Sequence, residues 1–113
     1  MQAHVTKLCY WKSEHNAETN EDAVCFDVAA GLFAVADGVG SASFSNIWAD
    51  ILVKHFVTAP LMSNDPFEIE WWLRRAQSEY AHRAPRVEDL PAFAQEKARE
   101  GSQSTLVSLR IEH

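Results

Sequence analysis

The chain is poor in cationic residues, long apolar runs and cysteine, and each shortage excludes a class of protein. Lys and Arg number 10 against 16 Asp and Glu, so the formal charge is −6 and the pI is near 5.2. No cationic field therefore draws the chain to nucleic acid or to anionic lipid. No window reaches the ~18–20 apolar residues of a membrane span, and no apolar signal-peptide core opens the sequence. We expect neither a nucleic-acid partner nor a membrane partner.

Cysteine is limited to Cys9 and Cys25. Two cysteines are too few for a disulfide scaffold, and they lack the C-x-x-C spacing of zinc or redox sites. A reducing cytoplasm is the default for such a chain. We therefore expect a cytoplasmic protein in which both thiols pack as small hydrophobic groups.

What the chain does contain is enough apolar material for one core. The apolar share is 47% and the aromatic share 11%, including 4 Trp and 6 Phe, which lies well above the range of disordered chains. A length of 113 residues corresponds to a single compact domain, residues 1–113.

Hydrophobic periodicity predicts strands first, then helices, then one closing strand. Alternation predicts strands at His4–Trp11, Ala23–Val28, Leu32–Ala36 and Ser104–Ile111. Helical spacing predicts a helix with an apolar stripe from Phe44 to Phe56, a second from Asp65 to before Pro85, and a third over about Pro91–Glu100. This order predicts an α+β fold, an antiparallel β-sheet with helices packed on one face.

Two of the predicted helices carry start signals. Ser41 or Ser43 can cap the first turn of the first helix. In the second helix, Asp65 stands at the N-cap, Pro66 at the first helical position and Glu68 three residues after the cap, which is a capping-box pattern.

The hairpin around Ala29 and Ala30 predicts a pair of facing carboxylates. With these two alanines as the turn, the register places Asp22 opposite Asp37, with Cβ atoms ~4.5–5.5 Å apart. Facing like charges are destabilising. They are relieved by a shared proton, by a bound cation or by divergence into water.

The residues around this pair favour a cation held by oxygen. The motif contains no His, Cys or Arg, so Mg²⁺ or Mn²⁺ suits it better than zinc. Gly38 has no Cβ, so its carbonyl can turn toward an ion and the chain can bend into the next helix. Two other interpretations stay open: acidic residues at strand ends are commonly solvated, and a register shift of one residue would exchange Asp22 for Glu21.

Three segments carry a family resemblance: Asn20-Glu-Asp-Ala23, the run from Gly31 through Val-Ala-Asp37-Gly38 to Gly40, and Gly101-Ser-Gln-Ser-Thr105. In order and spacing the chain resembles the metal-dependent protein phosphatases of the phosphatase 2C type, over about the first half of that domain. The resemblance implies a four-layer αββα sandwich. It also implies two Mn²⁺ or Mg²⁺ ions that activate water to attack phosphoserine or phosphothreonine in a phosphoprotein substrate.

The resemblance also assigns roles to individual residues. Asp37 would bridge both ions, Gly38 would lend its carbonyl, and Glu21 would bind one ion directly or through water. Asp22 would bind an ion and orient the water, so Asp22 and Asp37 are the catalytic candidates. Thr105 matches a structural position.

Two departures from the family pattern leave a second interpretation open. Family members usually carry an Arg shortly before the Glu-Asp pair, where this chain has Ala17 and Glu18, and no Asp follows Asp89 to match the family's later aspartates. The chain is thus expected to be the N-terminal portion of a phosphatase, nearly inactive alone, or a non-catalytic phosphatase-like interaction module. The surfaces left uncovered predict a homodimer or a missing second half of the domain.

The remaining histidine, arginine and tryptophan residues have structural interpretations, and the arginines also have a functional one. His55 is expected at a helix edge. The arginines at Arg74-Arg75 and Arg83 to Arg86 are expected to be solvated, with contact to a phosphorylated partner as the alternative. Trp71 and Trp72 are adjacent, so one of them is expected to be exposed.

Overall fold

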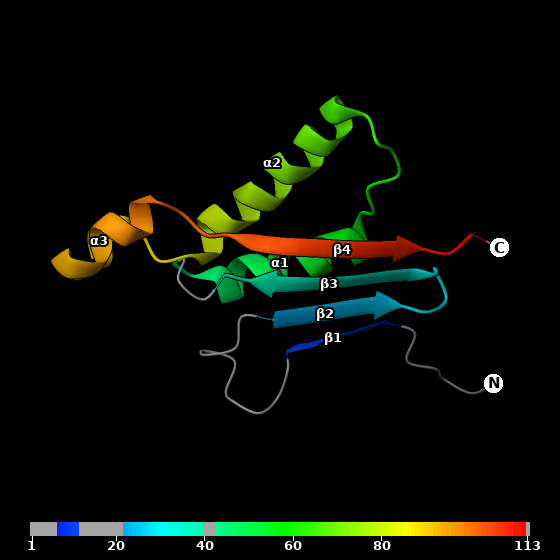
Figure 1. Cartoon of the computed structure of the whole chain (residues 1–113), viewed down its shortest axis with the longest axis horizontal. Coiled ribbons are helices and arrows are strands. Elements are labelled where there is room, and N and C mark those ends of the chain that lie inside the picture. Colours follow the sequence, from blue (N-terminus) through cyan, green and yellow to red (C-terminus); the bar gives the residue numbers. More distant parts are fainter. Residues whose placement is uncertain (1–6, 12–21, 40–42, 113) are drawn as a thin grey trace.

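The computed structural model describes residues 7–11, 22–39 and 43–112 (Figure 1). Its strands are β1 (Lys7–Trp11), β2 (Asp22–Asp27), β3 (Leu32–Gly38) and β4 (Ser104–Arg110). Its helices are α1 (Ser45–Thr58), α2 (Pro66–Arg83), the 3-10 helix η1 (Val87–Asp89) and α3 (Ala92–Arg99). The predicted α+β order is confirmed, and the start predicted for the first strand, at His4, lies outside the described residues.

The four described strands form one antiparallel sheet in the order β1-β2-β3-β4. Side chains alternate between its two faces, and one face is lined by small buried residues. These are Ala23, Cys25, Ala34 and Ala36, none more than 5% exposed. Small side chains let a helix approach the strands closely, and this face carries α1.

Helix α1 is the middle layer of the molecule. It packs on β2, β3 and β4 with one side and on α2 with the other (Figure 1). Its buried residues therefore exceed a single stripe: Ser45, Ala49, Asp50, Ile51, Leu52, Val53, Phe56 and Val57. The carboxylate of Asp50 accepts from Arg83 (2.9 Å) of α2 and pairs with Lys54 (3.0 Å), which ties the two helices together.

The helix starts agree only in part with the predicted caps. Asp65 Oδ1 accepts from the backbone N–H of Phe67 (2.9 Å), as predicted. The Asp65 N–H donates to Ser63 Oγ (2.9 Å) rather than to Glu68, so the capping box is incomplete. At α1 the cap position is Phe44, with φ 56° and no side-chain cap. The Ser43 cap was thus wrong, and Ser41 lies outside the described residues.

The prediction that all helices lie on one sheet face is wrong for α3. Helix α2 packs on α1, on the same side of the sheet, whereas α3 lies beyond the end of the sheet and contacts η1 (Figure 1). Its Phe93 is 88% exposed. No residue of α3 is buried, and α3 packs on no apolar surface of the described sheet.

The two cysteines are joined, which corrects the expectation of free thiols. Cys9 of β1 lies directly opposite Cys25 of β2, with Cα atoms 4.0 Å apart, and the two form a disulfide. The cysteines are 16 positions apart in sequence, and the β1–β2 register brings them together.

The other face of the sheet is apolar and uncovered by any described element (Figure 1). We call it the open face; its residues are Val24, Phe26, Phe33, Val35, Val107 and Leu109. Val35, Val107 and Leu109 are 52%, 71% and 56% exposed. A contiguous apolar patch on a sheet is typical of an interaction surface.

Among the described residues, no helix is long and apolar enough to cross a membrane.

The conformation of Gly31 in the β2–β3 turn predicts that this position does not tolerate a side chain. Its φ is 70°, and a Cβ built on it would lie 2.5 Å from the carbonyl oxygen of Ile111. Gly31→Ala should therefore cost more than about 2 kcal/mol in the free energy of unfolding, because backbone strain and a backbone clash add. Urea unfolding measures this.

Gly101→Ala is the matched control. Its φ is 88° but the space around it is open, so only strain remains, at about 1 kcal/mol. Equal losses in the two variants would contradict the role of the Ile111 contact.

Candidate metal site at the end of the sheet

The hairpin brings Asp22 and Asp37 together as predicted. Asp22 is the first residue of β2, Asp37 is the last but one of β3, and the two are direct register partners. Phe26 pairs with Phe33 in the same register, with ring centroids 6.3 Å apart. Since alternate residues share a face, both carboxylates stand on the open face. Asp37 is exposed and Asp22 half-buried.

Thr105 extends this pair across a third strand. It lies opposite Asp37 on β4, and its hydroxyl donates to the Asp37 backbone carbonyl (3.4 Å). The hydroxyl therefore contacts the backbone that carries the carboxylate. This agrees with the structural position expected for Thr105.

Gly38 ends β3 and does not make the predicted bend. It is buried and extended, opposite Ser104, and the glycines with left-handed φ in the described residues are Gly31 and Gly101. Phe44 takes up the left-handed conformation instead, just before α1. For a residue with a side chain this costs ~1–3 kcal/mol and is found most often near functional sites.

The donors fit Mn²⁺ or Mg²⁺ in kind but are few in number. Carboxylate oxygens suit hard divalent ions, which seek about six oxygen ligands. Glu21 lies outside the described residues. Within residues 7–11, 22–39 and 43–112, no group of three or more His, Cys, Asp or Glu could hold a metal. Among the described residues, Asp22 and Asp37 alone therefore do not make a complete metal site.

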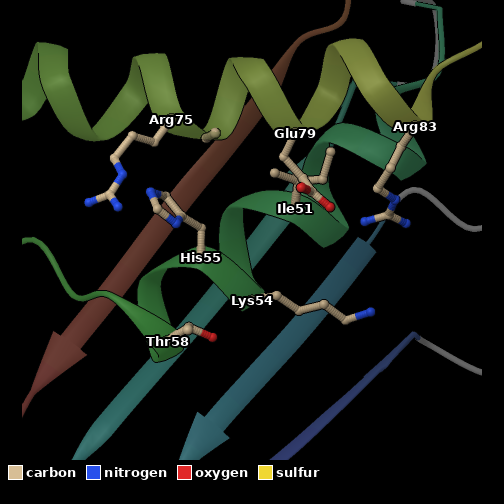
Figure 2. Close-up of a pocket in the computed structure, with 8 residues that line it drawn as sticks. Ile51, Lys54, His55, Thr58, Arg75, Glu79 and Arg83 are labelled. Atoms are coloured by element: carbon tan, nitrogen blue, oxygen red, sulfur yellow. The ribbon is translucent and has the colours of Figure 1, made fainter.

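A second polar feature is a pocket of about 400 Å³ between α1 and α2 (Figure 2), lined in part by the arginines that the sequence analysis singled out. His55 and Thr58 of α1 face Arg75 of α2 at one end, and Lys54 and Arg83 lie at the other. The helical spacing of Arg75 and Arg83 places both on one face of α2. This spacing predicts that the two arginines share a pocket only once α1 is known to pack against that face of α2.

Comparison with known protein families gives one finding. The family model described as Protein phosphatase 2C matches residues 12–110. No curated protein matches the chain, and no solved structure does. The match spans most of the chain, including the Asp22–Asp37 hairpin and β4. The chain therefore belongs to the protein phosphatase 2C family.

Proposed function

We propose that the chain is the N-terminal portion of a Mn²⁺- or Mg²⁺-dependent protein phosphatase that hydrolyses phosphoserine and phosphothreonine in phosphoproteins. The observation that carries the proposal is the Asp22–Asp37 pair on adjacent strands, within a chain that matches the phosphatase 2C family over residues 12–110.

A bound cation would relieve the repulsion within this pair. Directly opposed like charges destabilise a sheet by ~0.2–1 kcal/mol, and these two stand beside the apolar rows Val24–Val35 and Phe26–Phe33. A divalent ion would convert the repulsion into two attractions. Asp22 and Asp37 would then bind the ion, and the ion would stabilise the pairing of β2 with β3.

In the proposed site the ions would be held by Glu21, Asp22, Asp37 and the Gly38 carbonyl. Divalent ions in such a site lower the pKa of water and neutralise the phosphoryl oxygens. Asp37, at the centre of the β2–β3–β4 row, would hold the ions in place. Asp22 would orient the attacking water toward the phosphorus atom.

We further propose that the open face is the inner surface of the four-layer αββα sandwich. A second sheet, from the rest of the domain or from a second copy of the chain, would pack on Val35, Val107 and Leu109. Sheets packed face to face lie ~10 Å apart and interdigitate side chains of this kind. Helices α1 and α2 would then form one outer layer.

A non-catalytic interaction module is the second candidate. It is favoured by the absence of an Arg close before Glu21, where Ala17 and Glu18 stand. Without that cation the substrate phosphate lacks a usual partner. The two candidates differ in whether the intact protein hydrolyses a phosphopeptide.

The intact protein tests the catalytic proposal. Asp37→Asn should abolish Mn²⁺-dependent phosphate release from a phosphothreonine peptide, a loss of at least about a hundredfold, because one carboxylate would serve both ions. Asp27→Asn, at the other end of β2, is the control and should keep activity. Its side chain accepts from the Ala30 N–H (3.1 Å) in the turn. Full activity in Asp37→Asn would refute the assigned role.

Metal affinity of the 113-residue chain is a separate prediction. We expect Mn²⁺ to bind with a Kd no tighter than about 10⁻⁴ M, since few protein ligands are present. Isothermal calorimetry should show this weak binding disappear in the double variant Asp22→Asn/Asp37→Asn. An unchanged isotherm would mean that the ion binds elsewhere. Tight binding of two ions would contradict the second candidate.

The open face predicts self-association of the isolated chain. Sedimentation velocity should show dimers or larger species whose fraction grows with concentration. Leu109→Lys should reduce this fraction because it places a charge on the exposed apolar face. Phe93→Lys, at an even more exposed apolar position on α3, should leave it unchanged. A chain that stays monomeric at every concentration would contradict the prediction.

A further inference from the structure

Tyr80 of α2 begins a chain of two hydrogen bonds that ends on the backbone just before α1. Its hydroxyl oxygen lies 2.6 Å from Ser102 Oγ, and Ser102 Oγ donates to the carbonyl of Ser43. A serine hydroxyl has one proton to donate, and Ser102 donates it to Ser43. The Tyr80 hydroxyl is therefore the donor to Ser102, and the two bonds reinforce each other.

The ring of Tyr80 holds this hydroxyl in place. It packs edge-on against Trp48 of α1, with ring centroids 5.8 Å apart, and both side chains pack against the core. Tyr80 lies near the C-terminal end of α2, at the end of the sheet where β2 begins and β3 ends (Figure 1). The same end of the sheet carries Asp22 and Asp37.

Two residues just before β4 hold both ends of the connection from β3 to α1. The Val39 N–H, directly after β3, donates to the Gln103 carbonyl (2.9 Å). The Ser43 carbonyl, shortly before α1, accepts from Ser102. Because Ser102 and Gln103 are adjacent in the chain, the contact with Tyr80 restrains the hydrogen bonds that both of them make.

Phe44 indicates that this connection needs such a restraint. Its φ of 56° is left-handed, and no side chain caps the first turn of α1. A residue with a side chain keeps this conformation only where surrounding contacts determine it. The hydrogen bond from Ser102 to the carbonyl of the preceding residue, Ser43, is a contact of this kind.

The bond between Val39 and Gln103 also sets the direction of the Gly38 carbonyl. The Gly38 carbonyl and the Val39 N–H belong to one planar trans peptide, so they point in opposite directions. The Val39 N–H points to Gln103, on the β4 side. The Gly38 carbonyl therefore points away from β4, toward the side of β2, whose first residue is Asp22.

We propose that Tyr80 and Ser102 are positioning residues of the proposed metal site. They hold Gln103, and Gln103 holds the peptide whose carbonyl, that of Gly38, is a proposed ligand. This inference rests on the proposed metal-dependent function and adds to it two residues that touch neither the ion nor the substrate. Loss of the Ser102 hydroxyl would let the Gly38–Val39 peptide rotate, which would weaken metal binding more than it slows the chemical step.

Amide hydrogen exchange of the 113-residue chain, in EDTA, tests the restraint on the backbone without metal or activity. We expect the Val39 amide to exchange at least about tenfold faster in Ser102→Ala, because local opening frees it from Gln103. Tyr80→Phe should act in the same direction by about threefold, since it removes one bond of the two. Unchanged exchange of Val39 in Ser102→Ala would overturn the proposal whatever the activity of the protein.

Ser104→Ala is the matched control in the same segment. The Ser104 hydroxyl donates to the carbonyl of its neighbour Thr105 (2.8 Å) and not to the β3–α1 connection. This variant should leave the Val39 exchange rate within about twofold of the wild type. Ser102→Thr keeps a hydroxyl and should restore slow exchange. Equal effects of Ser102→Ala and Ser104→Ala would contradict the assignment.

Activation of the intact protein by Mn²⁺ tests the consequence for the metal site. Ser102→Ala should raise the Mn²⁺ concentration for half-maximal phosphate release at least about fivefold, while kcat at saturating Mn²⁺ changes less than twofold. A residue with a merely structural role would lower the melting temperature, measured by circular dichroism, without changing the Mn²⁺ requirement. An unchanged Mn²⁺ requirement, or a fall in kcat alone, would overturn the positioning role.

The wild-type protein separates failure of this inference from failure of the proposed function. A wild type without Mn²⁺-dependent phosphate release refutes the proposed function, and the positioning role falls with it. An active wild type whose Ser102→Ala variant keeps the same Mn²⁺ requirement retains the proposed function and overturns only the positioning role.

Discussion

The contact between α1 and the alanine-lined face of the sheet determines where everything else lies. Ala23, Ala34 and Ala36 are almost completely buried beneath the helix, and small side chains allow this close approach. The other side of α1 receives α2, tied by the buried carboxylate of Asp50 to Arg83. Without Arg83, the buried Asp50 carboxylate would keep Lys54 of its own helix but would lose its ion pair to α2. Sheet, first helix and second helix are thus one continuous packing unit.

Local signals accounted for much of this fold. The β2–β3 register follows from the Ala29-Ala30 turn, because a hairpin fixes every pair once its turn is fixed. The start of α2 at Asp65-Pro66 follows from capping chemistry within a few residues. Features that depend on distant elements were missed. The Cys9–Cys25 bond requires the β1–β2 register, and the position of α3 depends on what surface is available to it.

The acidic pair and the pocket between α1 and α2 differ in the same way. The Asp22–Asp37 pair lies within one hairpin, so its geometry could be predicted from sequence alone. The pocket between α1 and α2 exists only after the two helices pack, and the adjacent arginines then differ: Arg74 pairs with Glu70 along α2, whereas Arg75 lines the pocket. Residues one position apart on a helix point about 100° apart. Sequence cannot tell which of them meets another element.

The acidic pair and the uncovered valines occupy the same side of the β-sheet. A second sheet that covers Val24 and Val35 must lie next to both aspartates, because the valine pair is two positions from the Asp22–Asp37 pair. Burial of this face would then also bring the oxygen-bearing side chains of that layer close to the proposed ion site. Packing of the second sheet would complete the hydrophobic core and the proposed metal site at the same time. Hydrolysis would then require the assembled domain.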